Sequence, residues 1–284
     1  MTDGDRKFAF ITGAASGIGR ATAELFAEKG WWIGAADRNP EGLEELRHAL
    51  GKERCRTWLL DVTDKAAYDA VIAELAEETG GRLDLLYNNA GIGAAGFFEE
   101  IPIEENLKVV DVNLIGVLHG IYAALPLLKA TPNSLCFTTS SSAATYGAPH
   151  LAVYSATKFA VKGLTEALAV ELSRCGVRVA DVLPGVIDTP IFDDSPVFVE
   201  GRRQATMGGT VATNAPKEGP FRLVSPHLVA EAVWRCSEGD PRMHWYVPEE
   251  IEEIDKAKAR DPEAMRDLRI EALKAGPPAA SEEA

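Results

Sequence analysis

The chain has 284 residues and a mass of 30.5 kDa, long enough for a single domain to bury a full hydrophobic core. It carries 43 acidic and 29 basic side chains, a net charge of −14 and a pI near 4.9, which argues against nucleic acid and anionic membrane surfaces as partners. Residues 1–6 are polar and lack an apolar signal core, so we expect a cytoplasmic protein.

A short apolar run near the N-terminus, Lys7–Thr12, has the composition of a buried strand. The glycine-rich stretch Gly13–Gly19 follows at once, and a helical pattern comes after it. In this order of elements, backbone N–H groups and a helix N-terminus can receive a pyrophosphate. The spacing Gly-x-x-x-Gly-x-Gly departs from the common Gly-x-Gly-x-x-Gly dinucleotide fingerprint.

The next predicted strand, Trp32–Arg38, contains Asp37 near its end, eighteen residues after Gly19. A carboxylate there can accept hydrogen bonds from the ribose hydroxyls of an adenosine, and it repels a 2′-phosphate. Arg38 is a counter-argument, because its guanidinium could receive that phosphate. Since Ser16, which precedes Gly17, is not basic, we predict NAD as the preferred cofactor.

The rest of the chain alternates between apolar runs and helical patterns. Further strands are predicted at Arg56–Val62, Leu83–Tyr87, Ser134–Thr139, Val177–Leu183 and Trp245–Pro248, and helices at Asp64–Glu78, Glu104–Lys129 and Val153–Arg174. The alternation predicts an α/β fold, a single Rossmann-type doubly wound parallel sheet of about seven strands with helices on both faces. Ligands of such sheets lie beyond the carboxyl ends of the strands, where the polar groups and glycines of this chain are found: Gly13–Gly19, Asp61, Asn88–Gly91, Ser140–Ser142 and Pro184-Gly185.

Tyr154 and Lys158 stand four residues apart near the start of the predicted helix Val153–Arg174, so both side chains emerge from one helix face. A phenol is a poor acid or base at neutral pH, because its ordinary pKa is about 10. A nearby ammonium favours the phenolate, and we therefore expect Lys158 to lower the pKa of Tyr154. The pair is a candidate proton-transfer device.

In this combination the motifs resemble those of the short-chain dehydrogenase/reductase (SDR) family over about residues 7 to 190. The matching elements are Thr12–Gly19, Asp61-Val62, Asn88–Gly91, Asn113, the serine cluster, Tyr154-x-x-x-Lys158 and Pro184–Thr189. The resemblance implies an NAD(P)-dependent enzyme in which Tyr154 is the catalytic acid and base, and Lys158 binds the nicotinamide ribose and lowers the tyrosine pKa. It also implies that Asn113 holds a water between Lys158 and solvent.

The same resemblance implies a cofactor site along the strand ends. Asp61 would contact the adenine edge, Asn89 and Ala90 would lie along the cofactor, and Ile187 and Thr189 would meet the nicotinamide carboxamide. The full implied set is Gly13, Ser16, Gly17, Ile18, Gly19, Asp37, Arg38, Asp61, Val62, Asn89, Ala90, Gly91, Tyr154, Lys158, Pro184, Gly185, Ile187 and Thr189.

The catalytic serine has to be chosen among Ser140, Ser141 and Ser142, which cannot all face the same crevice because side chains alternate along a strand. The family usually places this serine thirteen residues before the tyrosine, which selects Ser141. The other two serines would then be packing or turn residues.

We expect a domain over 1–249, which includes a substrate-loop region over 190–225, and a C-terminal helical extension over 250–284, interrupted at Pro262, with a disordered end. The substrate pocket would be built by Ile92–Phe98, Ala143–Leu151 and the stretch after Thr189. The apolar residues of that last stretch favour a bulky aromatic or alicyclic substrate, and subunit contacts are the alternative explanation for them. The extension departs from the usual family ending and puts the family's tetramer in doubt, so both homodimer and homotetramer stay open.

Cysteine and histidine usage adds no further chemistry. Cys55, Cys136, Cys175 and Cys236 include no Cys-x-x-Cys motif, and the five histidines show no metal-ligand spacing, so we predict reduced thiols and no metal. His150 is the one histidine of interest, because it lies four residues before Tyr154. The apolar stretch Asp111–Lys129 contains Asn113, His119 and Pro126, and we interpret it as buried or interfacial and not as a membrane span.

Three functions remain open at this point. The first is an NAD-dependent oxidoreductase that transfers a hydride between nicotinamide and a small-molecule secondary alcohol or ketone. The second is an NADPH-dependent ketoreductase of the same fold, and the third is a non-catalytic NAD-binding sensor or scaffold. The complete set of Ser141, Tyr154, Lys158 and Asn113 argues against the third, because a protein without turnover has no chemical need for all four.

Overall fold

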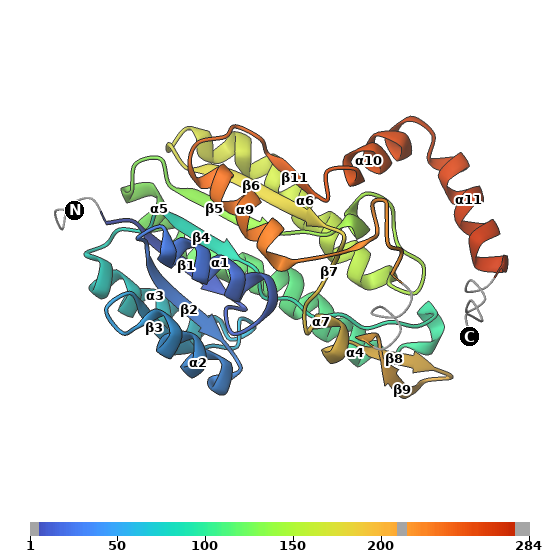
Figure 1. Ribbon diagram of the computed structural model, residues 1–284, viewed down its shortest axis with the longest axis horizontal. Coiled ribbons are helices and arrows are strands. Elements are labelled where there is room, and N and C mark those ends of the chain that lie inside the picture. Colours follow the sequence, from blue (N-terminus) through green and yellow to red (C-terminus); the bar gives the residue numbers. More distant parts are fainter. Residues whose placement is uncertain (1–5, 209–214, 276–284) are drawn as a thin grey trace.

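The computed structural model of the protein describes residues 6–208 and 215–275. Its centre is a seven-stranded sheet in the order β11-β6-β5-β4-β1-β2-β3, in which every neighbouring pair is parallel (Figure 1). The strands are β1 Phe8–Thr12, β2 Trp32–Asp37, β3 Cys55–Leu59, β4 Leu85–Asn88, β5 Leu135–Thr139, β6 Arg178–Pro184 and β11 His244–Val247. The predicted doubly wound α/β sheet is therefore confirmed.

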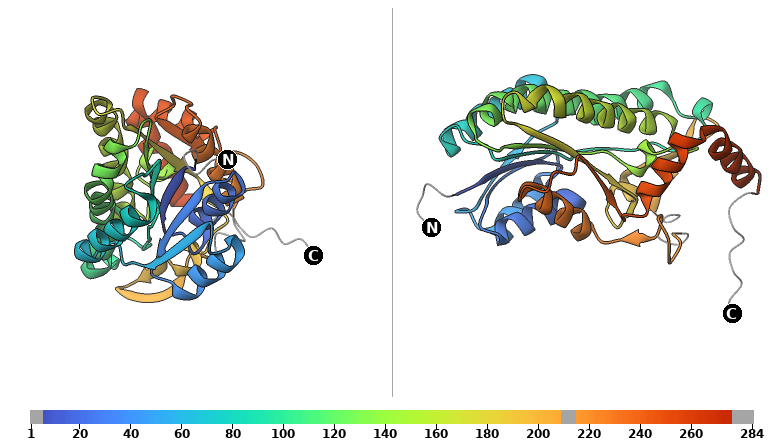
Figure 2. Two further views of the ribbon diagram at one scale, coloured as in Figure 1. Left: turned by 90° about the vertical axis from the view of Figure 1, so that its left-hand side faces the viewer. Right: turned by 90° about the horizontal axis from the view of Figure 1, so that it is seen from above.

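Helices cover both faces of the sheet, as the right-hand view of Figure 2 shows. They are α1 Gly17–Glu28, α2 Pro40–Leu50, α3 Lys65–Thr79, α4 Ile103–Val110, α5 Gly116–Ala130, α6 Ala152–Ser173 and α9 Pro226–Ser237. Alternate residues of β1 feed the two cores, because successive side chains of a strand point to opposite faces. Ile11 packs in one core with Phe26 of α1 and Val229 of α9, while Phe10 packs in the other with Tyr68 of α3.

Two of these helices, α2 and α9, were not predicted. Each begins with a residue whose side chain accepts a main-chain N–H, followed by a proline: Asn39 accepts from Gly42, and Ser225 accepts from His227. Such a cap with proline at the first helical position is a helix-start signal that was available in the sequence.

The predicted helix Glu104–Lys129 is one continuous helical stretch made of α4, the π-helical segment η3 (Asp111–Ile115) and α5. By length and hydropathy the stretch Ile103–Ala130 could cross a membrane. Val117, Ile121 and Leu128 nevertheless pack in the core beside the sheet, as in the core helix of a globular domain.

The substrate-loop region is more regular than the sequence suggested. It contains the short helix α7 (Ile191–Asp194) and an antiparallel hairpin of β8 (Pro196–Val199) and β9 (Arg202–Thr206). Further on, β10 (Leu223–Val224) pairs with β7 (Val186–Ile187) directly after β6. Residues 209–214 of the region lie outside the described residues.

Two C-terminal helices follow the sheet, α10 (Ile251–Arg260) and α11 (Pro262–Ala275), and the expected interruption at Pro262 is confirmed. Asp255 anchors α10, because its carboxylate accepts a hydrogen bond from the Tyr246 hydroxyl at 2.7 Å and forms an ion pair with Lys162 of α6. The expected disordered end, residues 276–284, lies outside the described residues.

Candidate active site

The loop between β1 and α1 is shaped by glycines that other residues could not replace. Gly13 and Gly17 have φ angles of 65° and 52°, in the left-handed region that favours glycine. A Cβ at Gly19 would lie 2.1 Å from the carbonyl oxygen of Gly13, far inside any van der Waals contact. The first turn of α1 contains no acidic residue, so its free N–H groups present positive charge toward the end of the sheet. The loop therefore suits a phosphate that must approach the backbone closely.

Asn89 holds this loop in place. Its side-chain amide donates to the carbonyl oxygens of Thr12 (3.0 Å) and Gly13 (3.3 Å). The hydroxyl of Thr12 in turn accepts from the main-chain N–H groups of Asn89 and Ala90, both at 3.1 Å. These four hydrogen bonds involve only main-chain groups and two short side chains. They therefore fix the end of β4 relative to the glycine loop.

The two predicted adenosine contacts lie at neighbouring strand ends. Asp37 is partly buried, and its carboxylate accepts from the main-chain N–H groups of Ala15 and Asn39, each at 3.0 Å. Asp61 is exposed, and hydrogen bonds from Thr63 lower its carboxyl pKa, with the charge of Arg38 acting in the same direction. The positive charge of Arg38 thus lies near the negatively charged carboxylate of Asp61.

Ser141 and Tyr154 meet at the carboxyl end of β5. Ser141 caps the short helix η4 (Ser142–Ala144), and its hydroxyl accepts the N–H of Ala143 at 3.1 Å. It also forms a side-chain hydrogen bond with the Tyr154 phenol. Ser140 points elsewhere, because its buried hydroxyl donates to the main-chain carbonyl of Lys158 at 2.9 Å. Of these two serines, the structure brings Ser141 to the tyrosine.

Lys158 lies beside this pair. Its Nζ is 5.6 Å from the centre of the Tyr154 ring and donates to the carbonyl oxygen of Thr139 at 2.9 Å. Burial lowers the pKa of this ammonium to about 8. Burial also raises the pKa of Tyr154, and the Ser141 hydrogen bond opposes that rise only in part. The expected lowering of the tyrosine pKa is therefore wrong for this structure, because the phenol loses more solvation than the neighbouring polar groups return.

Asn113 completes the group from the π-helical segment η3, a type of helix distortion that is frequent at functional sites. Its side chain is fully buried, accepts the N–H of Ile92 at 2.9 Å and donates to the Ile92 carbonyl at 2.9 Å. Gly91 lies directly beside it, since a Cβ there would be 3.3 Å from Asn113 Oδ1 and 3.6 Å from Lys158 Nζ. The Asn113 amide thus holds the loop after β4 alongside Lys158.

The segment after β6 closes the other side of the site. The Gly185 N–H donates to the Val247 carbonyl, and Ile187 is held in the β7–β10 pair. Thr189 reaches the glycine loop, because a Cβ at Gly17 would lie 3.0 Å from Cβ and Cγ2 of Thr189. The segment Gly185–Thr189 thus lies at the same edge of the sheet as the glycine loop.

The sequence over residues 7–197 matches the family model described as short chain dehydrogenase. The chain belongs to the short-chain dehydrogenase family. It is 32% identical over 255 residues to the oxidoreductase BOA17 of Botryotinia fuckeliana, covering 88% of this chain and 92% of that protein.

Two solved structures share the fold of this chain. A short-chain dehydrogenase/reductase of Burkholderia phymatum in complex with NAD superposes with a TM-score of 0.79 at 29% identity, covering 93% of this chain and 97% of that one. An alcohol dehydrogenase of Thermococcus sibiricus complexed with 5-hydroxy-NADP gives 0.69 at 27% identity, covering 85% and 94%. The short-chain dehydrogenase described here is thus an oxidoreductase by family.

Two threonines of this short-chain dehydrogenase were missed as site residues. Thr12 holds the main chain of Asn89 and Ala90, and Thr139 binds Lys158 through its carbonyl and Asn89 through its hydroxyl, at 3.0 Å from Oδ1. Both end a strand of the sheet, and that position was the available signal. Their role is to support side chains that reach the crevice.

Two of the three segments expected to build the substrate pocket contribute apolar residues beside Tyr154. Tyr154 packs against a small apolar cluster that includes Ile92, Ala94 and Phe198 of β8. His150 adopts a φ of 64°, and its exposed ring lies 4.5 Å from that of Phe97 between ring centres, so it connects the two loops at the rim. Within residues 6–208 and 215–275, no group of three or more His, Cys, Asp or Glu side chains is placed to hold a metal ion.

Proposed function

We propose that this short-chain dehydrogenase transfers a hydride between NAD and a bulky, apolar secondary alcohol or ketone, with Tyr154 as acid and base. The hydrogen bond between Ser141 and Tyr154, with the Lys158 ammonium beside them, is the observation that carries this proposal. When bound, the nicotinamide ring would accept or supply the hydride.

The side chains of this chain would manage the proton and the developing charge. In oxidation, the Tyr154 oxygen takes the proton of the substrate hydroxyl; in reduction it returns a proton to the carbonyl oxygen. The Ser141 hydroxyl donates to the same substrate oxygen as negative charge grows on it. Lys158 would favour the ionised phenol and bind the ribose. Asn113, fixed by its two hydrogen bonds to Ile92, would hold a water between Lys158 and solvent.

The residues at the strand ends fit a dinucleotide. The left-handed Gly13 and Gly17 and the absence of space for a side chain at Gly19 support a pyrophosphate at the start of α1. Ser16, Ile18, Val62, Asn89, Ala90, Gly91, Pro184, Gly185, Ile187 and Thr189 would line the rest of the site. Asp37 supports NAD over NADP, because its carboxylate stands where a 2′-phosphate would bring like charge. NADP-dependent reduction remains the alternative, favoured by the adjacent Arg38.

The substrate is proposed from the side chains around Tyr154. Tyr154 and Ile92 pack against an apolar cluster that includes Ala94 and Phe198, which suits an aromatic or alicyclic body next to the reacting carbon. The test is a panel of hydroxylated and oxo compounds assayed with NAD(H) and NADP(H) by the absorbance of the reduced nicotinamide. Turnover of none of these compounds with either cofactor would refute the proposal and favour a non-catalytic NAD-binding role.

We further propose a homodimer or homotetramer in the cytoplasm, formed through α4, α5 and α6. Tyr122 of α5 and Val170 of α6 are 72% and 75% exposed, which is unusual for large apolar side chains. The net charge of −14 argues against nucleic acid and anionic membranes as partners, because both carry negative charge. Light scattering of the wild type and of Val170→Asp tests the interface, because a buried carboxylate should shift the mass toward the monomer.

A further inference from the structure

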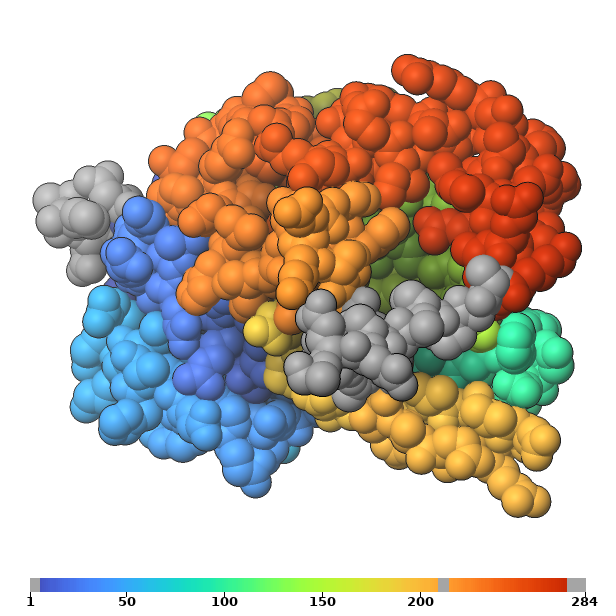
Figure 3. Space-filling model, turned by 45° about the vertical axis from the view of Figure 1, so that its right-hand side comes forward, coloured from blue at the N-terminus to red at the C-terminus, as the bar shows by residue number. Residues whose placement is uncertain are grey.

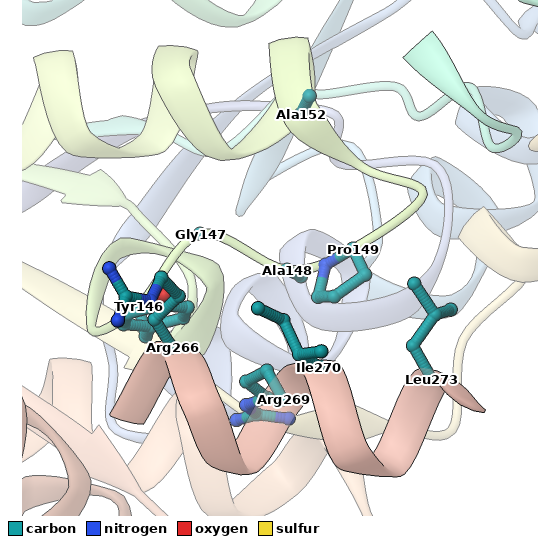
Figure 4. A pocket seen from close by; sticks show the side chains of 9 residues that line it. All are labelled: Tyr146, Gly147, Ala148, Pro149, Ala152, Arg266, Arg269, Ile270 and Leu273. Carbon is teal, nitrogen blue, oxygen red and sulfur yellow. The ribbon is translucent and has the colours of Figure 1, made fainter. Parts of the chain in front are cut away.

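A pocket of about 430 Å³ lies between the C-terminal helix α11 and the loop that joins η4 to α6 (Figure 4). Its walls come from Tyr146, Pro149 and Ala152 on one side and from α11 on the other. In the sequence this loop lies between the two proposed catalytic residues, Ser141 and Tyr154, and the lining residue Ala152 stands two positions before Tyr154 at the start of α6. In Figure 3 the C-terminal helices, in red, stand at the edge of a hollow with a green floor. The volume is within the range of small-molecule sites.

The face of α11 that lines the pocket combines apolar and charged groups. Three lining residues follow Arg266 by three, four and seven positions: Arg269, Ile270 and Leu273. This spacing places all four on one side of the helix. Figure 4 shows Ile270 and Leu273 pointing from α11 toward the loop. Both are large apolar side chains that stay 43% and 46% exposed, so the pocket presents an apolar wall to solvent.

The two arginines differ in their partners. Arg266 is exposed, and its guanidinium pairs with Asp267 at 2.8 Å. Arg269 is partly buried, its Cζ lies 5.8 Å from the centre of the Phe221 ring, and its Nε is buried without a hydrogen-bond partner. Among the described residues no carboxylate forms an ion pair with Arg269. A guanidinium whose buried Nε lacks an acceptor, next to an apolar wall, is complementary to a carboxylate on an apolar body.

We propose that this pocket is a subsite for the distal carboxylate of an alicyclic or aromatic substrate, with Arg269 as the anion-binding group and Ile270 and Leu273 as apolar contacts. This inference rests on the function proposed above and narrows its substrate to oxo or hydroxy acids. It also gives the C-terminal extension a role in specificity, since both parts of the recognition come from α11.

Calorimetric titration of the full chain with 4-cyclohexylbutanoate and with 4-cyclohexylbutanamide tests the subsite, because the two ligands differ only in the charge of the distal group. The wild type should bind the acid at least about tenfold more tightly than the amide, the gain of one charge-assisted pair. In Arg269→Met the affinities for the acid and the amide should lie within about threefold of each other. The affinity for the amide should be the same as in the wild type. Ile270→Ala should weaken both ligands alike.

Arg260→Met is the matched control, since it removes the same charge from the exposed end of α10, and it should leave both affinities unchanged. Equal binding of acid and amide by the wild type would overturn the subsite, as would no binding of either. So would an Arg260→Met effect equal to that of Arg269→Met, because it would show a general effect of charge. The titration needs neither cofactor nor turnover, so its failure is distinct from loss of dehydrogenase activity.

Discussion

The ammonium of Lys158 donates a hydrogen bond to the main-chain carbonyl of Thr139 at 2.9 Å. This contact ties α6 to the end of β5 and fixes Nζ beside the Tyr154 ring. The same position takes the ammonium out of water, and burial lowers its pKa from 10.5 to about 8. The buried position of Nζ therefore sets both the geometry of the site and a pH dependence of stability.

The first prediction concerns that pH dependence. The folded protein loses the Lys158 proton near pH 8, and the unfolded chain loses it near 10.5. Between these values the unfolded state binds more protons, so this group makes the free energy of unfolding rise with pH, by on the order of 3 kcal/mol across the window. Denaturant unfolding of wild type and Lys158→Met at several pH values measures the difference. The free energy of unfolding of the wild type minus that of Lys158→Met should increase from pH 8 to 10.5. The same difference taken with the exposed Lys129→Met should show no such trend.

Replacing Tyr154 by phenylalanine removes the acid and base but keeps the ring. We expect turnover to fall by about 10²–10⁴-fold or more, while NAD affinity stays within about threefold. Steady-state kinetics and a fluorescence titration of the cofactor measure the two effects. Tyr122→Phe, which changes an exposed tyrosine of α5, should retain turnover. Turnover by Tyr154→Phe at the wild-type rate would remove Tyr154 from its proposed role.

Asp37 should decide between the two nicotinamide cofactors. Serine at this position keeps an acceptor for the Ala15 N–H but removes the charge, so the affinity for NADPH relative to NADH should rise by about tenfold or more, with Arg38 free to bind the 2′-phosphate. Titrations of both cofactors measure the ratio. Glu41→Gln removes an exposed charge from the first turn of α2 and should leave it unchanged. An unaltered ratio in Asp37→Ser would contradict the NAD assignment.

The glycine loop should tolerate no side chain at position 19. An alanine Cβ would lie 2.1 Å from the Gly13 carbonyl and 2.7 Å from the Asn89 amide nitrogen, so the loop must move and the link from Asn89 must break. We expect Gly19→Ala to weaken NAD binding by at least about a hundredfold, with a melting temperature lowered by several degrees. Wild-type affinity in this variant would show that the cofactor does not rely on the close approach.

Asp255 should control how firmly the C-terminal helices attach. Asp255→Ala removes the acceptor of the Tyr246 hydroxyl and the partner of Lys162, two contacts at a site where both charged side chains are less than a fifth exposed (17% and 13%). Hydrogen exchange in α10 and α11 should become faster, by about tenfold to a hundredfold for a loss of roughly 1–3 kcal/mol. Glu252→Ala removes an exposed ion pair with Lys256 and should have little effect.

Much of the fold was predictable from the sequence because local pattern and global topology agree. Apolar runs such as Lys7–Thr12 can be buried on both faces only in a sheet covered by helices, and helical patterns between them require parallel crossovers. Asn39-Pro40 and Ser225-Pro226 carried the start signals of the two helices that were missed. The hairpin of β8 and β9 had no comparable signal, because its pairing depends on contacts with Ala95 and the rest of the rim.

The amino-acid sequence by itself determined which residues could meet, since residues at the carboxyl ends of parallel strands share one edge of the sheet. It also determined the tyrosine and lysine as partners, through their spacing of four on one helix. Only the tertiary structure decided how far each group is removed from water, which is why the pKa of Tyr154 rises against expectation. It alone placed Arg269 of α11 beside the loop leading to Tyr154, because no local pattern encodes a contact between elements more than a hundred residues apart.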